Sequence, residues 1–252
     1  MRDDTDLFEY LLRLGDDRLV LGHRLSQWCG HAPILEEDIA LANISLDLIG
    51  EANLLLQLAG KVEDAGRDQD ALAYFREAVQ YRNALIAELP PGDFAFTIVR
   101  QLLVSVHSVL LLEKLSQVTH EDLAGIAAKA LKEARYHVRH SVDWVVKLGD
   151  GTEESHRRAQ VALDDLWRYT GELFEHDAVE QRLVGRQLAV DASALRDAWR
   201  TQVAAVVERA TLKLPADAFM QTGGRSGRHT EHLGHMLAEM QIVARSFPGA
   251  QW

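Results

Sequence analysis

Apolar residues recur every three or four positions along most of the chain, a spacing that places them on one face of an α-helix. The pattern predicts helices near residues 6–29, 34–61, 71–88, 94–118, 121–148, 154–175, 177–187, 193–212 and 230–246. Asp93 and Asp191 stand just before two of these helices as N-cap residues, and Thr119 with Asp122 resembles a capping box. No alternating pattern typical of a strand runs for a useful length, so the chain is predicted to be all-α.

The segment 34–61 is apolar on two sides. One apolar face is marked by Leu41, Ile44, Leu48 and Leu55, and a second by Ile39, Leu46, Ile49 and Leu56. A helix that is apolar on two sides is expected to pack on two sides. Together with the long segments 94–118 and 121–148, joined to each other by a short loop, this helix predicts an up-down helical bundle with additional helices around it.

The organisation of the chain predicts a single domain over residues 1–252. With 252 residues, of which 47% are hydrophobic, the chain is long enough to bury a large core. No internal repeat, low-complexity tract or linker divides it. The C-terminal segment 213–252 is expected to be a loop plus a helix docked on the bundle or on a partner.

Charge excludes some classes of partner. The formal net charge of −11 removes the electrostatic attraction that nucleic-acid binding requires. The N-terminal acids do not resemble a secretory signal, and charged or polar residues such as Arg100 and Glu113 interrupt the apolar stretch 97–115, which argues against a membrane span. The single cysteine, Cys29, is interpreted as a buried structural residue rather than a nucleophile. These features favour a cytoplasmic protein.

The candidate metal ligands are too few for two irons. A di-iron bundle requires a Glu from each of two helices and a Glu-x-x-His pair from each of the other two. On segment 34–61 the helical projection gathers one polar stripe, formed by Glu36, Asn43, Asp47 and Glu51. On segment 121–148, Glu133 and His137 lie four residues apart and are predicted to hydrogen-bond to each other.

Two further histidines do not complete the set. The only Glu-x-x-His pair, Glu153 and His156, stands where a helix begins, and its acid is typical of a helix N-terminus. His107 lies inside the apolar helix 94–118 and is predicted to be a hydrogen-bonded core histidine. The sequence therefore predicts no metal site and no catalytic residue in this chain.

A glycine-rich loop near residue 222 carries the second polar cluster, consisting of Arg225, Arg228, His229, Glu231, His232 and His235. Three interpretations stay open. The arginines could contact a phosphate, since glycine lets backbone donors approach closely. The three histidines, with Glu231, could form a zinc site. The segment could instead be an ordered tail docked on the bundle or on a partner, with these residues as its contacts.

Several long motifs resemble one family along nearly the whole chain. They lie at residues 14–33, 40–50, 132–137, 166–174 and 222–241. They are similar to the structural C subunit of bacterial phenylacetyl-CoA epoxidases. The resemblance implies a ferritin-like fold and a non-catalytic subunit of a multicomponent monooxygenase that acts in aerobic phenylacetate degradation.

The resemblance also implies where the chemistry resides. A catalytic A subunit of similar fold would bind the di-iron centre and the CoA thioester, and a reductase with flavin and an iron–sulfur cluster would supply electrons from NADPH for epoxidation with O2. This chain would hold no cofactor of its own. It would pair with the A subunit and other epoxidase subunits, and could form a homodimer when isolated. Trp144, Trp167, Trp199 and Trp252 are candidates for the interface.

On this view Asp47, Glu133 and His137 are the degenerate remnant of a metal site, kept as buried polar contacts. A core Asp47 would need protein or water partners. Two alternatives remain. The chain could itself be a ferritin-like di-iron oxidase, or it could bind CoA through Arg225 and Arg228.

Overall fold

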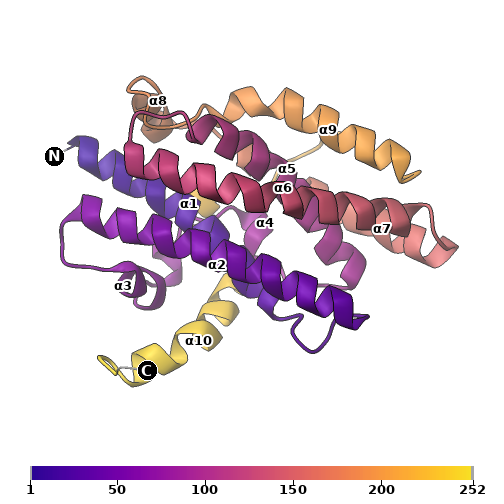
Figure 1. Cartoon of the computed structure of the whole chain (residues 1–252), viewed down its shortest axis with the longest axis horizontal. Coiled ribbons are helices and arrows are strands. Elements are labelled where there is room, and N and C mark those ends of the chain that lie inside the picture. Colours follow the sequence, from indigo (N-terminus) through magenta and orange to yellow (C-terminus); the bar gives the residue numbers. More distant parts are fainter. Residues whose placement is uncertain (1, 251–252) are drawn as a thin grey trace.

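Two pairs of antiparallel helices form the centre of the structure (Figure 1). In the first pair α1 (Arg2–Ser26) packs along α2 (Leu35–Glu63), and in the second α5 (Phe94–Leu115) packs along α6 (Glu121–Gly149). Contacts between α2 and α6 join the pairs. The computed structural model describes residues 2–250, with side chains from residue 5 onward, and that range contains no strand. The predicted all-α, ferritin-like bundle is confirmed.

Shorter helices surround this bundle. Helices α7 (Glu153–Trp167) and α9 (Arg196–Arg209) pack against α5 and α6, while α8 (Ala178–Val184) contacts α1. The last helix, α10 (Glu231–Ser246), leans away from the bundle and contacts α3 (Gln69–Tyr74), as Figure 1 shows. Three short 3-10 turns complete the later part of the chain: η2 (Gly171–Phe174), η3 (Ala192–Leu195) and η4 (Gly224–Ser226).

Local signals placed the long helices well. The predicted segments 34–61, 94–118 and 121–148 are observed at Leu35–Glu63, Phe94–Leu115 and Glu121–Gly149. The Asp93 carboxylate accepts a hydrogen bond from the Phe96 backbone N–H at 2.9 Å and caps α5, as expected. The capping box at Thr119 is wrong, because the N-cap of α6 is His120.

The single helix predicted over 71–88 is wrong. This stretch consists of α3, a 3-10 turn η1 (Ala78–Gln80) and α4 (Leu85–Glu88). Carboxylates on α1 accept its backbone donors: Asp16 accepts from Arg82 N at 2.8 Å, and Asp17 accepts from Ala84 N at 2.7 Å. These bonds replace the backbone hydrogen bonds of a continuous helix and hold the chain extended between η1 and α4.

The helix predicted over 154–175 ends eight residues early, at Trp167. Arg168 instead accepts a hydrogen bond from the Gln221 N–H at 2.7 Å, through its carbonyl oxygen. Gly171 allows a close approach here, since a Cβ at this position would lie 2.7 Å from Met220 Cγ. A contact with the distant C-terminal segment thus ends the helix.

Two helices, α2 and α5, are long and apolar enough to cross a membrane by length and composition. In α5, 83% of the most apolar window is buried inside the protein, so α5 is the central core helix of the bundle. In α2 the corresponding share is only 39%. The expectation that α2 packs on two sides is confirmed only in part, because α1 and α6 both pack against it. Leu56 of the second predicted face is buried, whereas Ile39 and Leu46 of that face are 53% and 66% exposed.

Candidate functional site: the polar seam of the bundle and the C-terminal loop

Asp47 on α2 and His137 on α6 meet where the two helix pairs touch. The Asp47 carboxylate lies 3.0 Å from His137 Nε2, with the histidine side chain buried and the aspartate side chain 33% exposed. Asp47 therefore has the protein partner that was predicted for it. The expected Glu133–His137 hydrogen bond is wrong, because His137 Nε2 faces Asp47. Burial lowers the pKa of His137, and the hydrogen bond and charge of Asp47 offset only part of that shift.

Two more polar pairs lie beside this contact, one between α6 and α2 and one between α1 and α2. His140 Nε2 lies 2.8 Å from the Glu37 carboxylate, and Arg18 Nε lies 3.0 Å from the Glu51 carboxylate. Both members of each pair are buried. Arg18 and Glu37 were not among the predicted site residues, and no spacing within one helix identifies them, because each partner comes from a different helix.

Glu133 lines a groove between α2 and α6 of about 230 Å³, together with Asp47, Glu51 and Lys129. Partial burial raises the pKa of Glu133, and the nearby charges of Asp47 and Glu51 raise it further. The structure thus gathers the predicted remnant, Asp47, Glu133 and His137, along one seam. It does not bring Glu36 or Asn43 into that seam, since both are exposed.

The residues of this seam do not fit a pair of irons. Among the side chains described, those of residues 5–250, no group of three His, Cys, Asp or Glu residues is arranged to hold a metal ion. The Arg18 guanidinium places a fixed positive charge beside the Glu51 carboxylate. The Asp47 carboxylate engages the His137 nitrogen that a metal ion would need. A cation repels a second cation, so the ion pairs and a metal ion are alternatives at this position.

The other candidate histidines have structural roles. His107 is buried beside Phe174, and burial lowers its pKa to about 3. The predicted hydrogen-bonded core histidine is confirmed, because His107 is buried and has a hydrogen bond with the Leu173 backbone, although its Nε2 has no partner among the described residues. His156 Nδ1 lies 2.7 Å from the Gly149 carbonyl oxygen at the start of α7, in agreement with the interpretation of Glu153 and His156 as a helix beginning.

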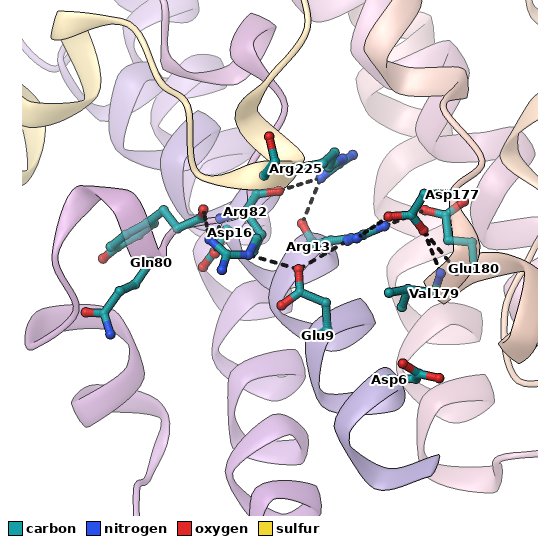
Figure 2. A network of polar contacts seen from close by, with 12 residues as sticks. Asp6, Glu9, Arg13, Asp16, Gln80, Arg82, Asp177, Val179, Glu180 and Arg225 are labelled. Atoms are coloured by element: carbon teal, nitrogen blue, oxygen red, sulfur yellow. Dashed lines mark hydrogen bonds and ion pairs between the residues drawn. The ribbon is translucent and has the colours of Figure 1, made fainter. Parts of the chain in front are cut away.

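Three buried carboxylates hold the C-terminal loop, and the first is Asp17 on α1. Arg225 donates two hydrogen bonds to it, at 2.9 and 2.8 Å. Figure 2 shows the Arg225 guanidinium also reaching the carbonyl oxygens of Arg13 and Arg82. Burial alone would lower the pKa of Arg225, but the charges of Asp17 and Glu172 outweigh it and raise that pKa. The guanidinium is therefore engaged inside the protein.

The second and third carboxylates are Glu88 and Glu172, both almost completely buried. Glu88 lies 2.8 Å from His229 Nδ1 and accepts the Thr230 N–H at 2.6 Å. Glu172 accepts the N–H groups of Gly223 and Leu85 at 2.9 and 2.7 Å. Each of the three carboxylates thus binds both the loop and the segment 83–85, directly or through the Asn83 side chain.

His229 is held at both ring nitrogens, since Nε2 lies 3.1 Å from the Tyr81 carbonyl oxygen. Two acceptors favour the doubly protonated ring. Burial alone would lower the pKa of His229, but the hydrogen bond to Glu88 and its charge outweigh burial and raise it. His229 and Glu88 therefore form a buried ion pair.

The rest of the cluster is more open. Arg228, Glu231 and His235 are exposed, and the half-buried His232 contributes only its carbonyl oxygen, which accepts a hydrogen bond from Arg24 at 2.8 Å. His229, His232 and His235 do not converge on a zinc site within the described part of the chain. The loop lies on the bundle, where Arg225 bonds to α1, and α10 packs against α3 and η1, in agreement with the interpretation as an ordered docked tail.

Several interface candidates are core residues instead. Trp167 and Trp199 are buried and stack with ring centroids 5.5 Å apart, and Trp144 is half-buried against Phe94. Trp252 lies outside the described residues. Cys29 is exposed, so its interpretation as a buried residue is wrong; it lies in the turn that follows α1.

Comparison with known proteins adds family information. A family model described as "Phenylacetic acid catabolic protein" matches residues 1–252. The chain is 48% identical over 248 residues to the C subunit of 1,2-phenylacetyl-CoA epoxidase from Escherichia coli (strain K12). That alignment covers 98% of this chain and 100% of the relative.

Proposed function

The chain belongs to the phenylacetic acid catabolic protein family, and from this premise we propose that it is the non-catalytic structural subunit of a 1,2-phenylacetyl-CoA epoxidase. Its relative in Escherichia coli is named as the C subunit of that enzyme and matches this chain from end to end. The proposal assigns the chemistry to a different polypeptide and assigns to this one the support of that polypeptide.

One observation carries the non-catalytic part of the proposal. Four of the side chains between α2 and α6 that could donate to a metal are engaged with one another, in the pairs Asp47–His137 and Glu37–His140. Each pair occupies a nitrogen and an oxygen that a metal ion would need, and removing one member would leave an uncompensated polar group. The Arg18–Glu51 pair adds a permanent cation. This arrangement supports a bundle that is stable without metal.

The proposed complex contains its cofactors elsewhere. A catalytic A subunit binds the di-iron centre and phenylacetyl-CoA, and a reductase with flavin and an iron–sulfur cluster delivers electrons from NADPH, so that O2 can epoxidise the ring. The complex is cytoplasmic in this proposal. The exposed, unpaired Cys29 supports a reducing compartment.

The proposal is tested by iron loading and reconstitution. The purified chain and the purified catalytic subunit are each incubated with ferrous iron and desalted, and their iron is measured. We expect the catalytic subunit to retain iron and this chain to retain less than one iron per molecule. Turnover of phenylacetyl-CoA with NADPH, O2 and the reductase is then expected only when both subunits are present.

Two outcomes would contradict it. Two tightly held irons in this chain, together with turnover in the absence of the catalytic subunit, would make it a self-sufficient di-iron oxygenase. Full turnover by the catalytic subunit without this chain would remove the supporting role. CoA binding by the isolated chain, measured by calorimetry, would favour the third alternative through the exposed Arg228.

A further inference from the structure

The open side of α2 is a continuous surface without charge. From residue 39 to residue 57 the exposed positions of this helix are Ile39, Asn43, Leu46, Gly50, Asn53 and Gln57. The two charged residues within this span, Asp47 and Glu51, are turned toward His137 and Arg18. The surface is about 27 Å long, at 1.5 Å per residue. We call its six exposed residues the α2 seam.

The spacing of the α2 seam suits a second helix. Its steps along the chain are four, three, four, three and four residues, which keeps a single stripe facing a partner helix. Depletion of charge is typical of the buried centre of a protein interface. Since α1 and α6 already cover the other side of α2, this stripe has no partner within the described residues.

Gly50 adds an independent observation. Glycine in the middle of a helix is destabilising, and nothing in the described structure lies within 4 Å of a Cβ placed at this position. The fold of this chain therefore does not require glycine there. The groove of about 230 Å³ opens beside Gly50 and Leu46, with carboxylates of Asp47, Glu51 and Glu133 along it. A glycine beside a groove lets a second backbone approach closely.

The charge of the neighbouring helix α6 indicates which kind of partner surface is complementary. On α6, across the groove, Lys129, Lys132 and Arg139 are exposed, and one exposed acid, Asp143, follows a turn later. Arg135 is also exposed but pairs with Glu113 on α5. This basic ridge is unusual in a protein of formal charge −11. A partner with acidic side chains opposite the ridge is complementary to it, whereas a second copy of this chain would present the same cations.

A membrane is a poorer fit than a protein. Asn43, Asn53 and Gln57 place three amide groups along the α2 seam. Amides buried in hydrocarbon without hydrogen-bond partners are costly, but a protein surface supplies such partners. The observations therefore favour a protein helix.

We propose that the α2 seam and the groove beside it receive a helix of the catalytic subunit, with an uncharged contact face, acidic flanking residues opposite the α6 ridge, and a hydrogen-bond donor directed into the groove. This inference rests on the proposed function, and it adds the surface and the chemistry of its partner. It also accounts for Ile39 and Leu46, the part of the second apolar face of α2 that the rest of the chain leaves exposed.

The test measures the affinity of the full chain for the iron-loaded catalytic subunit by calorimetry. Leu46→Asp places a charge in the centre of the α2 seam, and Gly50→Gln fills the space above the helix; each is expected to weaken binding by ~30-fold or more. Lys132→Glu is expected to weaken binding more at low salt than at high salt. Melting temperatures of the isolated variants are expected to stay at or above that of the wild type.

Matched controls separate a local effect from a general one. Val161→Asp changes an apolar residue on α7 that is 47% exposed, and Gly234→Gln fills a similarly open helix glycine on α10. Both are expected to bind like the wild type. The design requires no loss of folding, since every substituted side chain points to solvent in the isolated chain.

The binding results distinguish a failure of the proposed α2 contact from a failure of the proposed function. If the wild type binds the catalytic subunit and the α2 variants bind equally well, the inference is overturned while the proposed function stands. If Leu46→Asp instead abolishes a homodimer in sedimentation, or binding to anionic vesicles, the occupant is a second copy or a membrane, and the inference is again overturned. If the wild type neither binds nor supports turnover, the proposed function itself fails.

Discussion

Single carboxylates inside this protein each serve several donors from distant parts of the chain. Asp17 accepts hydrogen bonds from the Ala84 backbone and from both terminal nitrogens of Arg225. A charge that is buried and fully bonded is tolerated, but one that loses its partner is not. Arg225, one of the candidate functional residues in the C-terminal loop, therefore makes its contacts inside the fold.

Arg225→Ala is expected to lower the free energy of unfolding by ~3 kcal/mol, because it leaves the Asp17 carboxylate buried without its cation. Urea denaturation followed by circular dichroism measures this loss. Arg157→Ala is the control, since Arg157 forms an equally well-aligned pair with Glu154 on the surface of α7, where a change should be undetectable. Equal effects of the two substitutions would contradict this account of the loop.

The positions of neighbouring helices in this fold are limited by how closely their backbones can approach each other. The C-terminal end of α6 touches the end of α9, and a Cβ at Gly149 would lie only 2.1 Å from the Ala210 carbonyl oxygen. In the first turns of the same helix, Gly125 has nothing within 4 Å of its Cβ position. One helix therefore contains a glycine that its neighbour requires and one that it does not.

Gly149→Ala is expected to lower the free energy of unfolding by ~1–3 kcal/mol, because α9 must move away to admit the methyl group. Gly125→Ala is expected to raise it by up to ~1 kcal/mol, because alanine is the better helix former. Thermal and urea unfolding of both variants provide the measurement. Stabilisation by both substitutions would mean that α6 and α9 do not meet as described.

The free energy of unfolding of the whole molecule depends on pH through histidines whose pKa values are shifted in opposite directions. His107 is neutral in the folded state, with its pKa lowered to about 3 by burial, and His137 is shifted in the same direction. They stabilise the fold above their ordinary pKa of 6.5, and this contribution is lost as pH falls below 6.5. His229 has a raised pKa, so its contribution is complete below 6.5 and is lost as pH rises through the raised value.

The free energy of unfolding is therefore expected to fall on both sides of neutral pH, by up to ~1.4 kcal/mol per pH unit for each histidine. Urea unfolding at pH 5, 6.5 and 8 measures the profile. His107→Leu should flatten the acid side, and His229→Gln should flatten the alkaline side. A profile that keeps its shape in both variants would assign the pH dependence to other groups.

The sequence by itself determined the helical class and the long helices, and it predicted the lack of a ligand set for two irons. Apolar periodicity and caps such as Asp93 act within a few residues, so they can be recognised in one sequence. Counting donor types on each helix needs no tertiary structure. Likewise, the two apolar faces of α2 are visible as a pattern in the sequence, although only the structure shows that Ile39 and Leu46 of the second face are exposed while Leu56 is buried.

Only the tertiary structure decided which side chains pair between helices and where a helical pattern is interrupted. His137 pairs with Asp47, and not with Glu133, because α2 lies against α6 at that point. Residues 71–88 have a helical pattern but are divided by carboxylates of α1, whose hydrogen bonds join residues more than sixty positions apart. Local propensity amounts to a fraction of a kcal/mol per residue, whereas a buried donor left without an acceptor costs several times more, so the distant contacts prevail.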